Sequence, residues 1–288
     1  MNNIEKLQRT HAFPTIRVEA DPAGAEHWLY MHADAPTGVR PCFRTALMDD
    51  MWSYLTSITL RESQRRPGQL RHVVLASDAD AFNLGGDLEL FSRLIQSGNR
   101  EQLLAYARRC VEGVHAIHNS LGGDVRTIAL VQGDALGGGL ELALACQTIV
   151  AEEGATMGLP EVLFGLFPGM GAYSFLCKRV PAQLAEKIIL EGNMYSAEEM
   201  HRMGVVDVLA PKGQGEAAVR DLVRQQQRSP HAHLALNQVR QIAQPVGYDE
   251  LMGITEVWVD AALALGSRSL RTMERIVNAQ KRRAAVAA

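Results

Sequence analysis

Two adjoining stretches decide the fold: VQGDALGGGLELALAC, residues 131–146, and MGLPEVLFGLFPGMG, residues 157–171. Each carries one glutamate, Glu141 or Glu161, just after a glycine-containing turn and among apolar residues. A carboxylate in apolar surroundings loses hydration, which raises its pKa and lets it exchange a proton near neutral pH. The glycines at 137–139 leave backbone NH groups at a helix start open to a ligand, where they stabilise an oxyanion. The two stretches therefore predict an acid/base site beside an oxyanion-binding turn.

Strand-length apolar runs flank this site. They occupy residues 72–76, 127–131 and 148–151, as expected for strands that are buried on both faces of a sheet. Helices and glycine loops alternate with them, which favours βαβ units and a mostly parallel sheet. A pair of short strands is expected at residues 15–20 and 27–32, and one more at 205–209. Nearly everything else after Gly171 has helical spacing, so we predict an α/β core over residues 1–210 and a helical C-terminal region over 211–288.

Composition excludes several classes of protein. Hydrophobic residues make up 47% and charged residues 21%, an ordinary globular mixture, and the net charge of −3 favours neither nucleic acid nor an anionic membrane. No apolar run approaches the ~18 residues of a spanning helix. The four cysteines lack CxxC spacing, which argues against a zinc site or disulfides, and the first residues lack the apolar segment of a signal peptide. A cytoplasmic enzyme without metal or cofactor is predicted.

Four segments carry a resemblance to a known family. ALGGGLELALAC (135–146), GLPEVLFGLFPGMGA (158–172), DAFNLGGDLELF (80–91) and SAEEMHRMGVVDVLAP (196–211) together resemble the crotonase superfamily, also named for enoyl-CoA hydratase/isomerase. That resemblance implies an α/β fold with a ββα spiral core. Within the superfamily, the chain is most similar to the diffusible-signal-factor synthases of the RpfF type, with ITEVWVDAALALGSRSLRTMERIV (254–277) extending the match.

The resemblance implies roles for individual residues. Gly138 and Gly86 stand where the family supplies the two oxyanion NH groups, although a shifted register would offer Gly85 or Leu84 instead of Gly86. Glu141 and Glu161 occupy both positions that hydratases fill with acid/base glutamates. Their joint presence favours adding or removing water, and the sequence leaves acid and base unassigned between them.

Such a pair suits a thioester. Removing the α-proton puts negative charge on the carbonyl oxygen, which two NH donors stabilise, while an acid protonates a departing β-hydroxyl. One site could dehydrate a medium-to-long 3-hydroxyacyl thioester and then hydrolyse it, releasing the cis-2-unsaturated fatty-acid signal that the synthase resemblance implies. Two alternatives stay open: an enoyl-CoA hydratase of fatty-acid β-oxidation, and a non-catalytic crotonase scaffold that binds another protein.

The remaining expectations concern substrate and partners. Asn83 and Gly85 are expected to contact substrate in the first oxyanion loop. Residues 77–91 hold four acids and no base, which mildly favours acyl carrier protein over coenzyme A, because many coenzyme A users of the superfamily place a base near this loop. The resemblance also implies a sensor-kinase partner and a homotrimer or a hexamer. The candidates for an acyl-chain pocket are Met170, Trp258, Leu263 and Ile276.

Overall fold

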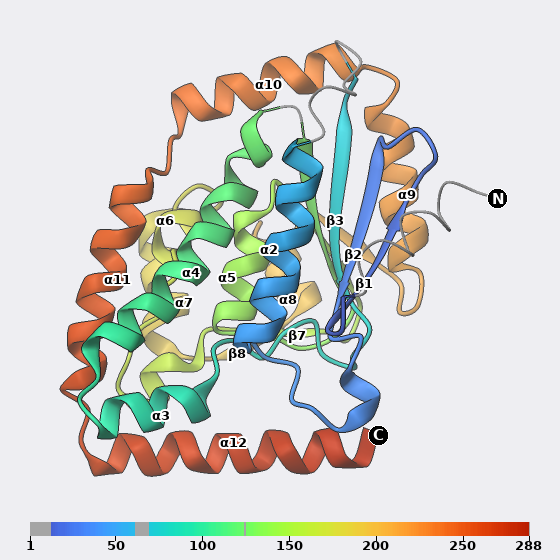
Figure 1. The fold of residues 1–288 in the computed structure, drawn as a ribbon. Helices are drawn as coiled ribbons and strands as arrows, with labels where there is room; N and C mark the ends of the chain where they lie inside the picture. Colours follow the sequence, from blue (N-terminus) through green and yellow to red (C-terminus); the bar gives the residue numbers. More distant parts are fainter. Residues whose placement is uncertain (1–12, 61–68, 124, 288) are drawn as a thin grey trace.

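The main sheet is mixed, with a parallel centre. The computed structural model describes residues 13–60, 69–123 and 125–287, and in that part of the chain six strands pair in the order β1-β2-β3-β4-β6-β9 (Figure 1). Only the β1–β2 pair is antiparallel. The bounds are β1 Ile16–Ala20, β2 Glu26–Met31, β3 Arg71–Ser77, β4 Val125–Val131, β6 Thr148–Glu152 and β9 Val208–Ala210. The α/β class predicted from the alternating pattern is confirmed.

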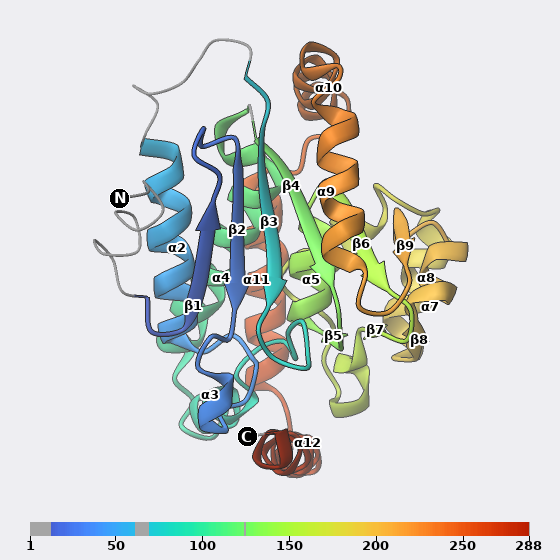
Figure 2. The same ribbon diagram turned by 90° about the vertical axis from the view of Figure 1, so that its right-hand side faces the viewer.

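Both faces of the central strands β3, β4 and β6 are buried, which explains their largely apolar sequences. The register places Trp28 beside Val74, and their face packs against α9 (Gly215–Gln226). Leu29 pairs with Leu75, and these side chains point to the opposite face because successive residues alternate. That second face is covered by α2 (Thr45–Leu60), α4 (Arg100–His118) and α5 (Gly138–Ala145), as Figure 2 shows.

A second, small sheet was not predicted. It orders β5 (Ala135–Leu136), β7 (Thr156–Gly158) and β8 (Met194–Ser196) within the described residues. Strands of two or three residues are too short to show a hydrophobic period. The Gly137 backbone NH donates to the Gly158 carbonyl oxygen at 2.8 Å, so this sheet ties together the two glycine-containing stretches.

The remaining helices surround the ends of the main sheet. The structure places α3 at Leu88–Gln96, α6 at Ala172–Leu176, α7 at Ala182–Glu191, α8 at Ala197–Arg202, α10 at Pro230–Ala243, α11 at Tyr248–Leu263 and α12 at Ser267–Ala287. Short 3-10 turns stand at η1 (Ala35–Thr37), η3 (Ser120–Gly122) and η4 (Pro160–Phe164). Helix α11 packs along α4, and α12 lies across α3 and η4 (Figure 1).

Two local expectations need correction or qualification. The strand expected at 205–209 begins only at Val208, because the NH groups of Val205 and Val206 donate to the Met200 carbonyl and end α8. The division at residue 210 stays a prediction. Val259 of α11 and Met273 of α12 belong to the same hydrophobic cluster as Leu29 and Leu75. Residues 1–12, on which the view of the N-terminus rests, lie outside the described residues, and none of the described helices is long and apolar enough to span a membrane.

Candidate active site

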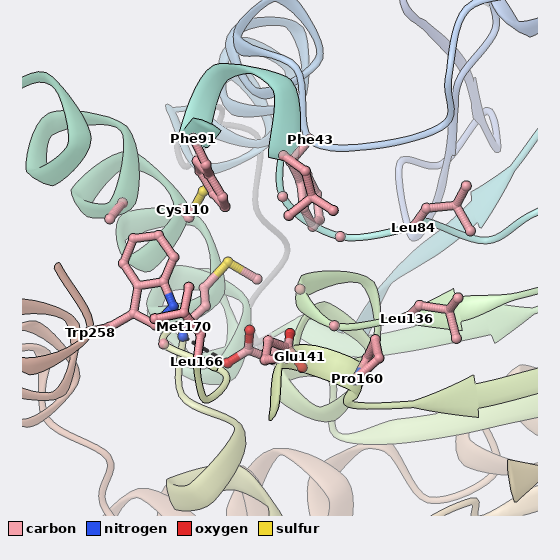
Figure 3. Close-up of a pocket in the computed structure, with 18 of the residues that line it drawn as sticks. Phe43, Leu84, Phe91, Cys110, Leu136, Glu141, Pro160, Leu166, Met170 and Trp258 are labelled. Carbon is pink, nitrogen blue, oxygen red and sulfur yellow. Dashed lines mark hydrogen bonds between the residues drawn. The ribbon is translucent and has the colours of Figure 1, made fainter. Parts of the chain in front are cut away.

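Both glutamates line one cavity, called here the main cavity. It lies beyond the carboxyl ends of β3 and β4, where the chain leaves two adjacent parallel strands, as ligand sites in parallel sheets commonly do. About 840 Å³ of space, its open mouth included, separates the lining atoms. Apart from the glutamates, the lining is mostly apolar. Figure 3 shows Glu141 at its centre, with Leu84 and Leu136 on one side and Cys110, Met170 and Trp258 on the other.

Glu141 is held by two backbone donors. It lies in the first turn of α5, is 3% exposed, and its Oε1 accepts from the NH groups of Met170 at 2.7 Å and Ala172 at 3.0 Å. Burial raises the pKa of this carboxyl, while the two donors oppose the rise by stabilising the charged form. Glu141 is thus a buried carboxylate that can still ionise.

Glu161 lacks comparable support. It lies in η4, and its Oε2 is buried without a hydrogen-bond partner among the described residues. Burial raises its pKa, and repulsion from Glu141 raises it further. A Cβ built on Gly137 would lie 2.5 Å from the other oxygen, Oε1, so only glycine at that position leaves room for this carboxyl. The charged form of Glu161 therefore has less support from its surroundings than that of Glu141.

Two backbone segments meet beside these carboxyls. A Cβ built on Gly138 would lie 3.5 Å from the Gly86 nitrogen, and one on Gly85 would lie 3.0 Å from the Gly138 nitrogen. Neither the Gly86 nor the Gly138 NH donates to another described residue, whereas the Gly85 NH donates to Asn83 Oδ1 at 2.8 Å. Because the Gly86 NH is free among the described residues and the Gly85 NH is not, Gly86 is favoured over Gly85 as the second oxyanion donor, beside Gly138.

Asn83 supports the loop and does not line the main cavity. It is fully buried, and besides Gly85 it contacts His32 through Nδ2 and Nε2 at 3.2 Å. Its carbonyl oxygen accepts from the Leu136 NH at 3.0 Å, and a Cβ on Gly139 would approach that oxygen to 2.0 Å. These contacts give Asn83 a structural role, in which it fixes the distance between the segments of Gly86 and Gly138, and its expected contact with substrate stays a prediction.

The expected acyl-chain residues are only partly brought together. Met170, Trp258 and Ile276 line the main cavity, and Leu263 does not. Leu263 is five residues after Trp258 on α11, a rotation of roughly 140° that turns its side chain away from the site.

Several lining residues were missed from the sequence. Phe91 forms edge contacts with Trp258 and with Tyr106, each with ring centroids 5.1 Å apart. The Tyr106 hydroxyl donates to the Phe43 carbonyl and accepts from the Asp87 NH at 3.2 Å, which holds the oxyanion loop against α4. Helical spacing identifies Phe91 and Tyr106 as buried, but it cannot tell a cavity wall from ordinary core.

The acidic loop at the mouth is neutralised by distant bases. Arg40, 8% exposed, pairs with Asp87 at 2.9 Å and with Glu89 at 3.3 Å. Lys281 of α12 reaches Glu89 at 2.8 Å. Helix α12, which extends to Ala287, thus brings a base to the mouth of the main cavity.

An outer cleft continues from this mouth. Leu84 and Gln280 line both the main cavity and the cleft, and Arg282 and Arg283 border the cleft from α12. Arg283 pairs with Asp134 at 3.1 Å, while Arg282 forms no ion pair with another described residue. A thioester's carrier arm could reach the glutamates through this cleft.

Comparison with known proteins identifies similar sequences. The family model described as enoyl-CoA hydratase/isomerase matches residues 39–245. The peroxisomal fatty acid beta-oxidation multifunctional protein AIM1 of Arabidopsis thaliana is 32% identical over 154 residues, which are 53% of this chain and 20% of that protein. The matching part thus spans only about a fifth of that relative.

Solved structures show the same fold at lower identity. An enoyl-CoA hydratase from Bacillus halodurans aligns with a TM-score of 0.72 at 18% identity, covering 91% of this chain and 99% of that one. DspI of Pseudomonas aeruginosa aligns with a TM-score of 0.66 at 24% identity, covering 92% and 88%.

Proposed function

The chain belongs to the enoyl-CoA hydratase/isomerase family, and on this premise we propose that it dehydrates a 3-hydroxyacyl thioester and then hydrolyses it. The substrate is a medium-to-long chain on acyl carrier protein, and the product is a cis-2-unsaturated fatty acid of the diffusible-signal type. The observation that carries the proposal is the pair of buried glutamates with raised pKa values, facing one apolar cavity beside two free NH donors.

The two carboxyls share one proton near neutral pH. Glu141 is ionised at rest because two NH groups donate to it, and Glu161 is protonated. When water adds to the double bond, the ionised group takes a proton from water and the protonated group gives one to Cα; dehydration runs both transfers backwards. Dehydration therefore starts with Glu141 protonated and Glu161 ionised: Glu161 takes the proton from Cα, and Glu141 protonates the departing hydroxyl.

Thioester hydrolysis uses the same parts. The NH groups of Gly86 and Gly138 hold the carbonyl oxygen, and their stabilisation of its negative charge contributes roughly 3 kcal/mol per donor. A glutamate takes a proton from water, the resulting hydroxide adds to the carbonyl carbon, and the carbon–sulfur bond breaks. The sulfur leaves with a proton, which yields a free acid and the carrier thiol.

Helix α12 supports a carrier protein as the donor. It carries exposed Arg268, Arg271, Arg275, Lys281, Arg282 and Arg283, with Glu274 as its only acid, and it borders the outer cleft. A basic helix attracts an acidic carrier protein, and the attached arm would enter beside Gln280.

An enoyl-CoA hydratase of fatty-acid β-oxidation is the second candidate. It is favoured by the relative from Arabidopsis thaliana, whose name assigns that protein to peroxisomal β-oxidation. The acid/base pair and the oxyanion donors would serve this reaction equally well, so only carrier and product distinguish the two candidates.

Product identification tests the proposal. The purified protein is incubated with a 3-hydroxydodecanoyl carrier protein, and the released acids are identified by mass spectrometry. Free cis-2-enoic acid is expected. Turnover of short enoyl-coenzyme A thioesters alone would instead support the β-oxidation hydratase, and no turnover of either substrate would leave a non-catalytic binding scaffold.

A further inference from the structure

We propose that the far end of the acyl chain lies in a second apolar cavity between α2 and α4, and that Gly113 keeps this cavity open to long chains. This α2–α4 cavity adjoins the main cavity and is lined by Met48, Met51, Val114 and Leu142, among others. The inference rests on the proposed function, because it concerns the same substrate.

The direction of the chain follows from the positions of mouth and carboxyls. The carrier arm enters beside Leu84, which lines both the outer cleft and the main cavity. Figure 3 shows Leu84 on one side of Glu141, with Cys110 and Met170 on the opposite side. A thioester whose reacting carbons lie at Glu141 therefore directs its acyl chain toward Cys110 and Met170.

At that end, one side of the main cavity is closed by an aromatic contact and another side adjoins the second cavity. Toward α3 and α11, the wall is formed by the contact between Phe91 and Trp258. Toward α2, the walls of the main cavity formed by Phe43, Cys110 and Met170 are also walls of the α2–α4 cavity. Among the described residues these three side chains are common to both cavities, so we infer that a long acyl chain passes between them into the second cavity.

The α2–α4 cavity has the chemistry of an alkyl site. Met48, Met51, Val114 and Leu142 are each at most 7% exposed, and methionine adapts its shape to a ligand. The charged lining residue is Arg109, whose guanidinium pairs with Asp49 and is 41% exposed at the rim. An apolar space inside a protein is unfavourable when empty, which gives its presence a functional explanation.

Gly113 lies inside α4, five residues before the last residue of that helix, His118. Glycine is less favourable than alanine inside a helix, so its presence there calls for a reason. It lines the α2–α4 cavity, and a Cβ at this position would meet no heavy atom within 4 Å. A larger side chain could be accommodated by the backbone and would occupy space that the proposal assigns to substrate.

The test compares Gly113→Leu with a matched control, Gly253→Leu. Gly253 is also inside a helix, α11, is exposed, and has nothing within 4 Å of a built Cβ. Both changes favour their helix, but only one fills the cavity. We measure kcat/KM on 3-hydroxybutyryl and 3-hydroxydodecanoyl thioesters and take the long-to-short ratio. The ratio should fall roughly tenfold or more in Gly113→Leu, because several buried methylenes lose their site, and should stay unchanged in Gly253→Leu.

Binding of free acids separates failure of this inference from failure of the proposed function. The melting temperature of the parent should rise with dodecanoic acid more than with butyric acid, and Gly113→Leu should lose that difference, whether or not the protein turns over thioesters. An unchanged long-to-short ratio in Gly113→Leu would overturn the inference while leaving the proposed function in place. Equal effects of both acids on the parent would also overturn it.

Discussion

The different partners of Glu141 and Glu161 decide how the pair can work. Glu141 accepts two backbone hydrogen bonds, while Glu161 leaves a buried oxygen without a partner in the described structure. Two carboxyls in one apolar cavity cannot both ionise easily, so their titration belongs to the pair. This arrangement supplies a base and an acid at the same pH without any third group.

The raised pKa of Glu161 predicts a stability change. Between pH 4.5, the ordinary value, and its higher native pKa, the folded state binds more protons than the unfolded state, so stability falls as pH rises through this window. Glu161→Gln removes that loss. Relative to the parent, the variant should therefore gain stability as pH rises from 4 to 8, by on the order of 1 kcal/mol for each unit by which the native pKa is raised. Below pH 4.5 the carboxyl is protonated in both states, and the difference in stability between the two proteins should not change with pH.

Denaturant unfolding at pH 4 and pH 8 measures this difference. The exposed Glu153 offers a control, since Glu153→Gln should leave the pH dependence of unfolding as it is in the parent. A Glu161→Gln variant whose stability tracks that of the parent at both pH values would show that the carboxyl is not destabilising in its charged form.

For single residues, the sequence predicts which groups can exchange protons better than it predicts which side chains line the cavity. A glutamate in an apolar stretch is conspicuous, and Glu141 and Glu161 do line one cavity. Asn83 does not line the cavity, because it is held by His32, which is distant in the chain. Leu263 does not line it, because its position on α11 turns its side chain away. The neutralising partner of Asp87, Arg40, lies 47 residues away, and no spacing rule finds it.

Among the helices, α12 gives the clearest prediction about how the substrate binds. Arg282 and Arg283 of this helix border the outer cleft, and Arg282 forms no ion pair in the described part of the chain. Arg282→Glu should lower kcat/KM on a 3-hydroxyacyl carrier protein several-fold, mainly by slowing association, because a surface charge mostly affects the encounter rate.

The matched substrate is the same acyl group on free pantetheine. Its kcat/KM should be unaffected by Arg282→Glu, and the effect on the carrier-protein substrate should shrink as salt is added. An equal loss on both substrates would mean that Arg282 does not act through a carrier protein.

Elements were predictable where a period or a buried run extends over several residues. The RHVVLAS and VRTIALV strands, β3 and β4, are buried almost throughout, as their apolar runs predict. The small sheet of β5, β7 and β8 escaped prediction because its strands are too short to carry a pattern. The helical character of the C-terminal region was predicted, but the position of α12 was not, because contacts such as that of Lys281 with Glu89 join residues far apart in the chain.

At the scale of the whole molecule, one helix presents an apolar surface. Leu236, Val239 and Ile242 on α10 are exposed, at spacings of three residues that place them on one side of the helix, and Ile242 is 82% exposed. Apolar patches of this kind mark protein contacts. We propose that α10 contributes to the contact in the homotrimer or hexamer that the family resemblance implies.

Ile242→Glu should shift the protein toward monomer in sedimentation velocity, because a charge would be buried in the proposed contact. Ile242→Gln tests whether lost apolar area alone is enough. Sedimentation of the parent as a monomer at micromolar concentration would contradict the proposed assembly, as would an Ile242→Glu variant that assembles like the parent.

The proposed mechanism requires that two glutamates act on one thioester, and variants of these glutamates test it most directly. Parent, Glu141→Gln and Glu161→Gln proteins are incubated with 3-hydroxydodecanoyl carrier protein, and the released acid is quantified by mass spectrometry, with folding checked by circular dichroism. The parent should release cis-2-dodecenoic acid, and each variant should be slower by ~10²- to 10⁴-fold while folded. A folded variant that releases the acid at the parent's rate would contradict the account.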